Sequence, residues 1–150
     1  MERQIKFRAK HIKNGAWLYG DLLQSNEGSV YIGVHGQYID DGYHFNDMYD
    51  ETCYVDEDTI GQFTGLLDKN GKEICEGDIL RSPLGNVVIV KFGYKEHIVK
   101  HDIFTDSFAA YGWIVENVKN GITDFLDNEF LQGEVIGNIH DNPSLISDKQ

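Results

Sequence analysis

Histidines and acidic residues are the side chains in this sequence whose types and spacing could support chemistry. His97 and His101 lie four positions apart, with Asp102 next to them. On a helix this spacing would place two imidazoles on one face, where they could bind zinc. The residues between them lack the glutamate of an HExxH motif, and the flanking sequence does not favour a helix. We therefore predict no metal site at these histidines.

A group of acidic residues falls within residues 36–51, which show no sustained hydrophobic period and are predicted to form a loop. Loop carboxylates can bind Ca²⁺ or Mg²⁺, but the order of ligands in an EF-hand is not met here. Two alternatives remain, a solvated surface that keeps the protein soluble and a surface that binds a partner. The candidate partner-binding residues are Asp40, Asp41, Asp47, Asp50 and Glu51.

The net charge of −12 is concentrated in one part of the chain. Residues 14–68 contain 11 acids and neither Lys nor Arg, whereas the rest of the chain has 14 acids and 13 bases. Proteins bind nucleic acids chiefly by neutralising phosphates with Lys and Arg, so direct nucleic-acid binding by this half is not expected. The acidic half could instead attract a basic partner or imitate nucleic acid.

Signatures of catalysis and of cofactor binding are missing from the sequence. It contains no GxSxG, GxGxxG or P-loop motif, so we predict no cofactor, and this argues against an enzyme. Glu76 and Asp78 could form an acid–base pair, but acids in a turn more commonly accept backbone hydrogen bonds. Cys53 and Cys75 each lie in an apolar segment, which predicts free and partly buried thiols.

Many short apolar segments separated by turn residues predict a mainly β fold with at most one or two short helices. The segments up to residue 34 form a β-meander, in which Asn14-Gly15 supplies the first turn. Residues 87–92 are continuously apolar up to Lys91, as in a strand that is covered on both faces.

The second half of the chain is less regular. Residues 93–108 are predicted to form a long polar connection that could hold a short strand, and 109–116 a further strand. Residues 122–131 have apolar positions near helical spacing, which predicts a brief helix. Five strands between residues 77 and 139 could close into a small barrel, because closure removes exposed strand edges.

The most informative segment is the run from Gly61 to Leu80, which alternates short apolar segments with turn residues. Asp68 at the first position and Gly71 at the fourth favour a type I turn that ends in a left-handed residue. Gly77 suits a second bend, since glycine can adopt a positive φ without penalty. The predicted structural turn residues are Gly61, Gly65, Asp68, Asn70, Gly71, Glu76, Gly77 and Asp78.

Four segments match the pattern of one known family, namely residues 5–9, the run 55–79, Gly112-Trp113 and the closing segment 134–143. On these segments the chain resembles the YopX family, whose members are encoded by phages and prophages. The resemblance implies a mainly β structure with an SH3-like barrel in the C-terminal part, and a phage or prophage source. It implies no catalytic residue, because the family has no established activity to transfer.

We therefore expect one domain, with an N-terminal β lobe at about residues 1–60, an SH3-like barrel lobe at about 61–143 and a tail at 144–150. The N-terminus has no apolar segment of signal-peptide length, and no segment approaches the roughly 18 apolar residues of a membrane span. A cytoplasmic location is therefore expected.

Two classes of function follow from these observations. The first is a non-enzymatic interaction module that binds a host or phage protein through its acidic surface. The second is a nucleic-acid-associated protein that either imitates nucleic acid or uses a basic N-terminal strand as its contact. Exposed edges in the N-terminal meander also make a homo-oligomer reasonable. The basic residues of that strand are Lys6, Arg8, Lys10 and Lys13.

Overall fold

The computed structural model describes residues 3–34 and 53–147, and the chain divides into two compact units, Met1–Gly65 and Leu66–Gln150. The first unit is built from an antiparallel sheet and a single turn of 3-10 helix. Its elements are β1 (Phe7–Lys10), β2 (Trp17–Gln24), β3 (Val30–Val34), η3 (Glu57–Thr59) and most of β4 (Gly61–Leu67).

The strands of the first unit lie in the order β3-β2-β1-β4. β1 pairs with β2 from Phe7↔Gly20 to Lys10↔Trp17, and β2 pairs with β3. Alternate residues of these strands face a small core, because successive side chains of a strand point to opposite faces. The buried core residues are Ala9, Val30, Ile32 and Val55.

The second unit is built around a five-stranded antiparallel sheet in the order β10-β6-β7-β8-β9. The elements of this unit, including those five strands, are β5 (Glu73–Cys75), β6 (Asp78–Arg81), β7 (Val87–Lys100), β8 (Thr105–Asn117), β9 (Thr123–Phe125), α1 (Asn128–Leu131), β10 (Glu134–Asn138) and η4 (Pro143–Ile146). β4 crosses the boundary between the units, and its end turns into β5 through residues 68–72. The buried core residues of this unit are Ile74, Leu80, Val88, Val90, Val115, Leu126 and Phe130.

The predicted mainly β class is confirmed, since all the long elements are antiparallel strands. The predicted closure of the barrel is wrong. β9 and β10 are the two ends of the five-stranded order, and no pairing joins them among residues 66–147. The strand pattern could not reveal this, because closure depends on the tilt and stagger of the whole sheet rather than on any one strand.

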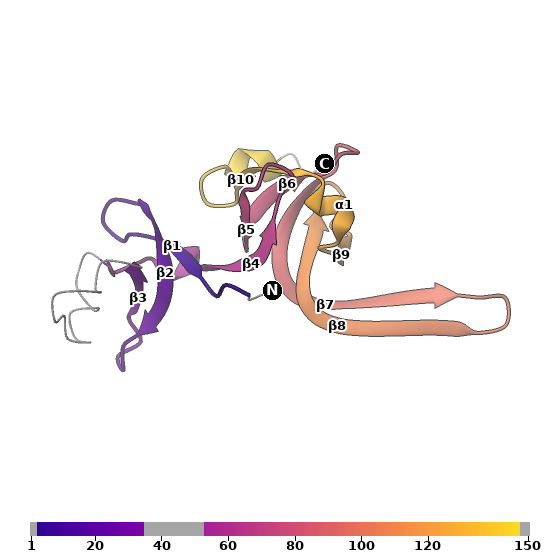
Figure 1. Ribbon diagram of the computed structural model, residues 1–150, viewed down its shortest axis with the longest axis horizontal. Coiled ribbons are helices and arrows are strands. Elements are labelled where there is room, and N and C mark those ends of the chain that lie inside the picture. Colours follow the sequence, from indigo (N-terminus) through magenta and orange to yellow (C-terminus); the bar gives the residue numbers. More distant parts are fainter. Residues whose placement is uncertain (1–2, 35–52, 148–150) are drawn as a thin grey trace. The chain divides into compact units, whose positions relative to one another are not determined.

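Residues 93–108, which the sequence predicts to be a polar connection, are instead the outer parts of the two longest strands. β7 and β8 stay in register from Val88↔Asn117 to Lys100↔Thr105, and Figure 1 shows them running side by side from the core into a long hairpin. We call residues 93–112 the arm. β6 pairs with β7 only as far as Ile89, and β9 pairs with β8 only as far as Ile114. Within the described residues the arm is therefore a two-stranded ribbon.

Residues 122–131, predicted to hold a brief helix, contain both β9 and the single helical turn α1. Asp127 caps this turn, because its Oδ1 accepts the backbone N–H of Glu129 at 3.0 Å. Over the described residues, no helix is long and apolar enough to cross a membrane.

Candidate functional site

An acidic pocket of about 360 Å³ opens in the first unit between η3 and the turn that joins β2 to β3. Four of its lining residues carry carboxylates, and one carries an aromatic ring. The lining residues are Ile12, Glu27, Gly28, Ser29, Val30, Tyr54, Val55, Asp56, Glu57 and Asp58.

The β2–β3 turn positions Glu27 at the mouth of this pocket. Ser25 closes the turn, since its backbone N–H donates to the carbonyl of Ser29 at 2.9 Å and its hydroxyl oxygen accepts the backbone N–H of Ser29. Gly28 adopts a φ of 89°, a left-handed conformation that glycine reaches without a steric cost. The turn therefore presents Glu27, whose side chain is exposed, above the start of β3.

The opposite wall of the pocket is η3 and the segment that leads into it. Asp56 caps η3, because its Oδ1 accepts the backbone N–H of Asp58 at 3.1 Å. Thr59 donates its hydroxyl to the carbonyl of Asp56 at 2.7 Å and accepts the backbone N–H of Lys10 at 2.8 Å. These bonds fix η3 against β1 and leave Glu57 and Asp58 exposed on the pocket side.

Two isolated bridges bring the walls together, Tyr31↔Tyr54 and His11↔Val55. The rings of Tyr31 and Tyr54 lie 5.4 Å apart, which holds Tyr54 at the pocket. The sequence marked Glu57 and Asp58 as part of an acidic segment, but it carried no signal that Glu27 and Tyr54 would join them. That proximity depends on pairings between residues more than 20 positions apart.

The pocket has the chemistry of a site for an organic cation. Carboxylates attract a positive charge, and a tyrosine ring binds both a cation and the apolar stem of a Lys or Arg side chain. Groups of three or more His, Cys, Asp or Glu side chains that could hold a metal ion are not found in the part of the chain that the structure describes. The five predicted partner-binding acids, Asp40, Asp41, Asp47, Asp50 and Glu51, lie outside the described residues.

Six of the eight predicted turn residues of the run 61–80 belong to the second unit, and Gly61 and Gly65 belong to the first. Asp68 is buried, and its Oδ1 accepts the backbone N–H groups of Asn70 and Lys72 at 2.8 and 2.9 Å. Its Oδ2 accepts the N–H of Val135 at 2.9 Å. Gly71 has a φ of 79° and donates its N–H to the carbonyl of Asp68. Asp68 therefore supports its own turn and also binds β10.

The remaining turn residues also have structural contacts. Gly77 has a φ of 87°, and its N–H donates to the carbonyl of Val90 at 2.9 Å. Asp78 is buried, and its Oδ2 accepts the N–H of Cys75 at 2.7 Å. Gly65 has a φ of 87°, and Gly61 pairs with Arg8 across the sheet. Glu76 is half-buried between Cys75 and Gly77. Cys53 and Cys75 are both buried and form no disulfide among the described residues.

Neither histidine of the arm lies on a helix, since His97 is in β7 and His101 follows the end of that strand. His97 is in β7 and faces Phe108, with 6.1 Å between the ring centroids. His101 stacks on Phe104 at 4.3 Å and lies 3.6 Å from the carboxylate of Asp106. These contacts fix the end of the hairpin.

Three of the four basic residues named for the N-terminal strand, Lys6, Arg8 and Lys10, lie over aromatic rings. The guanidinium of Arg8 is 4.7 Å from the centre of the Trp17 ring, and the residue is only 6% exposed. The amino group of Lys10 lies 5.4 Å from the same ring, and that of Lys6 lies 5.3 Å from the Phe63 ring. In this arrangement Arg8 has little surface to offer a phosphate.

Comparison with known proteins identifies the family of the chain. The model of the YopX protein family matches residues 6–147. The chain belongs to the YopX family. A search of curated proteins finds no match to it. Among solved structures it is similar to protein EF1440 from Enterococcus faecalis, with 25% identity over 97% of this chain and 99% of that one, at a TM-score of 0.40.

In this YopX chain the two longest family segments are hydrogen-bonded to each other. The bond from the Val135 N–H to Asp68 joins the closing segment to the run 61–80, and the N–H of Lys69 donates to the carbonyl of Gly133 at 3.1 Å. The N–H of Ile139 likewise donates to the carbonyl of Gly77 at 2.9 Å. The YopX pattern in this chain therefore marks one structural junction rather than two separate turns.

Proposed function

We propose that this YopX protein is a phage- or prophage-encoded interaction module without catalytic function, which binds a host or phage protein through its acidic N-terminal surface. Its phage source is proposed from the family resemblance. The observation that supports the binding role is the acidic pocket beside η3. Nine of its ten lining residues, all except Ile12, belong to the segment 14–68, which contains 11 acids and no Lys or Arg.

The pocket favours a Lys or Arg side chain of the partner as its ligand. Glu27, Glu57 and Asp58 supply carboxylates from two sides, and Tyr54 supplies a ring face. A flexible basic side chain can place its charge among the carboxylates while its methylene groups cover the ring. The acids of residues 40–51 join the same proposal, because they extend the base-free segment that includes most of the pocket's lining residues.

The test is a pair of matched double variants, each changing the net charge by the same amount. Glu57→Lys with Asp58→Lys reverses two exposed acids of the pocket. Asp124→Lys with Glu129→Lys reverses two exposed acids that line a separate pocket of about 180 Å³ in the second unit. Like charges placed at an interface weaken binding, so the pocket variant should bind its partner at least about tenfold more weakly.

Partners are captured from a bacterial lysate on the immobilised protein, and the affinity of the most enriched protein for each variant is measured by calorimetry. The control variant should keep the wild-type affinity. Equal affinities for both variants would remove the pocket from the proposal. A third variant, which reverses Asp40, Asp41, Asp50 and Glu51, tests the acids of residues 40–51 by the same affinity measurement.

The captured partner also separates protein binding from imitation of nucleic acid. If the acidic surface imitates nucleic acid, duplex DNA should compete with the YopX protein for the partner in a salt-dependent manner. Direct binding of DNA by the YopX protein itself is not expected, and a gel-shift experiment at low salt measures it.

A further inference from the structure

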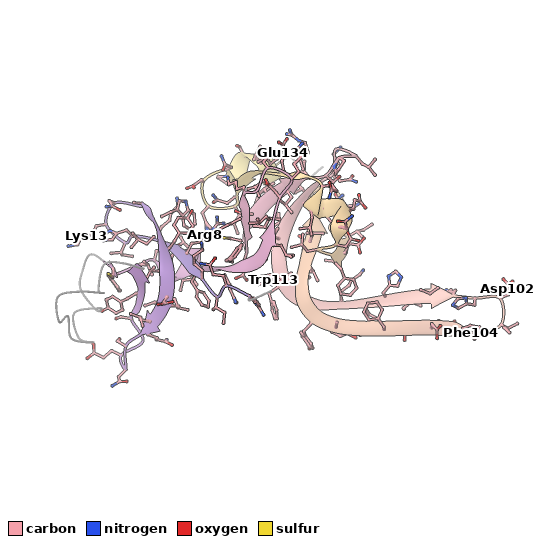
Figure 2. All side chains as sticks on the ribbon, in the orientation of Figure 1. Arg8, Lys13, Asp102, Phe104, Trp113 and Glu134 are labelled. Carbon is pink, nitrogen blue, oxygen red and sulfur yellow. The ribbon has the colours of Figure 1, made fainter. Side chains whose placement is uncertain are left out.

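The arm carries an apolar face that continues the core of the second unit. Val88 and Val90 are buried in that core, and Phe92, Tyr94 and Ile98 follow them on the same face of β7 because side chains alternate along a strand. On β8 the residues opposite are Trp113 and Tyr111, whose rings lie 5.3 Å from those of Phe92 and Tyr94. Figure 2 shows Trp113 where the arm leaves the core, and Asp102 and Phe104 at its far end.

Beyond the core this face is uncovered in the described residues. Four large apolar side chains on this face are between 52% and 77% exposed, namely Phe92, Tyr94, Ile98 and Tyr111, and at the hairpin end Ile103 and Phe104 are 92% and 52% exposed. Phe108, which is 57% exposed, lies on the opposite face with His97. At a typical area of about 200 Å² for each, the side chains of this face and the hairpin end expose roughly 750 Å². A standard protein interface buries about 800 Å² on each partner, so this face and the hairpin end together have about the area of one interface.

The charges of the arm favour a second copy of this chain as the occupant. The chain carries a net charge of −12, so most pairs of surfaces on two copies repel each other. Residues 91–112, the arm with Lys91 and Phe92 before it, are neutral, with three lysines and three acids. A basic partner would gain nothing from this neutral segment, whereas two copies can approach each other there without repulsion.

The spacing of the charges also fits a two-fold axis. Glu96 and Lys100 lie two residues before and two residues after Ile98, on the same strand and the same face. Consider a two-fold axis that lies between the two packed faces at the level of Ile98 and runs perpendicular to the strands. It would place Glu96 of each copy opposite Lys100 of the other. It would also bring the hairpin end of one copy, with Ile103 and Phe104, to the level of Tyr94 of the other.

We propose that this chain forms a two-fold dimer in which the apolar faces of two arms pack against each other, with Ile98 at the axis. The contact is isologous, so it closes on itself and does not propagate. It covers the apolar face that a monomer would expose, and such a face on a β-ribbon favours aggregation. This interface belongs to the second unit and is independent of the acidic pocket.

Charge exchange within the arm tests the dimer by sedimentation velocity over a range of concentrations. Glu96→Lys or Lys100→Glu alone should weaken dimerisation about tenfold, because each places two like-charge pairs at the interface. The two substitutions together restore opposite charges and should return the dissociation constant to near the wild-type value. Ile98→Arg should abolish the dimer. Each position is exposed, so circular dichroism is expected to show an unchanged fold.

The control is Lys95→Glu, which changes a charge on the opposite face of the same strand and should leave dimerisation unchanged. Three results would overturn the proposal: a wild-type protein that stays monomeric up to about 100 µM, a dimer that no arm substitution weakens, or a double variant that fails to recover. If the wild type is monomeric and the arm variants lose a captured protein instead, the occupant is a different chain.

Discussion

Replacing Asp68 with alanine should lower the free energy of unfolding by about 3 kcal/mol or more, because it removes the acceptor of three backbone N–H groups. A hydrogen bond to a charged group contributes about 1.5–3 kcal/mol, and Asp68 itself is buried. The loss also releases β10 from the 68–71 turn, since the Val135 N–H is one of the three donors. Urea unfolding of the wild type and the variant measures the difference.

The pH dependence of this effect identifies the carboxylate as its source. Burial by itself raises the pKa of Asp68, but the N–H donors of Val135, Lys72 and Asn70 and the charge of Lys72 outweigh it, so the pKa lies below its ordinary value. A carboxyl group with a lowered folded-state pKa stabilises the fold above its unfolded pKa, and this contribution disappears as pH falls through the folded value. Asp68→Asn should therefore be most destabilising at neutral pH, with a difference that narrows below about pH 4.

Asp102→Asn is the matched control, because Asp102 is exposed at the end of the arm. It should leave unfolding unchanged at neutral pH. A constant difference between the wild type and Asp68→Asn from pH 7 to about pH 3 would contradict the role assigned to the Asp68 charge.

Gly133→Ala is expected to have an effect of similar size for a different reason. A β-carbon at this position would meet the backbone carbonyl of Arg81 far inside normal contact distance, and it would also lie 3.1 Å from the carbonyl oxygen of Phe130. Both neighbours are backbone atoms, so the pairing of β10 with β6 must shift to make room. We expect a loss of about 3 kcal/mol in the free energy of unfolding.

Gly112→Ala is the control for this substitution, since no atom lies within 4 Å of a β-carbon built there. Thermal unfolding of the two variants side by side should show a large fall in melting temperature for Gly133→Ala and almost none for Gly112→Ala. Comparable effects would show that the cost arises from the loss of glycine itself rather than from the contact with Arg81.

The sequence predicted those parts of the fold in which local pattern and burial agree. The apolar segment 87–92 is a strand because its inner half is buried, and Gly71 and Gly77 have the positive φ values that a turn requires. The arm was missed for the opposite reason. Apart from the stack of Phe108 on Phe125, neither face of this two-stranded ribbon packs against another described element, so Lys95, Glu96 and His97 can follow one another without breaking the structure.

The parts of the candidate site that the sequence could not predict depend on long-range contacts. Glu27 reaches the pocket only because β3 pairs with the segment before η3, through Tyr31 and Tyr54. Asp68 was predicted as a turn residue, but its bond to Val135 spans 67 positions. A single sequence indicates a turn, because turn preferences are local. It does not indicate which distant backbone group the same side chain will bind.

The glycine pair at the base of the arm has a consequence for how the molecule fluctuates. Gly93 and Gly112 face each other across β7 and β8 at the point where the strands leave the core. Beyond them, strand pairing in the described residues joins only β7 and β8, and Phe108 of β8 stacks on Phe125 of β9 at 5.3 Å. Because the arm has few packed partners, we expect it to open locally at a lower free energy than the core. How long the two strands of the arm stay paired then depends on the surface that packs against its apolar face.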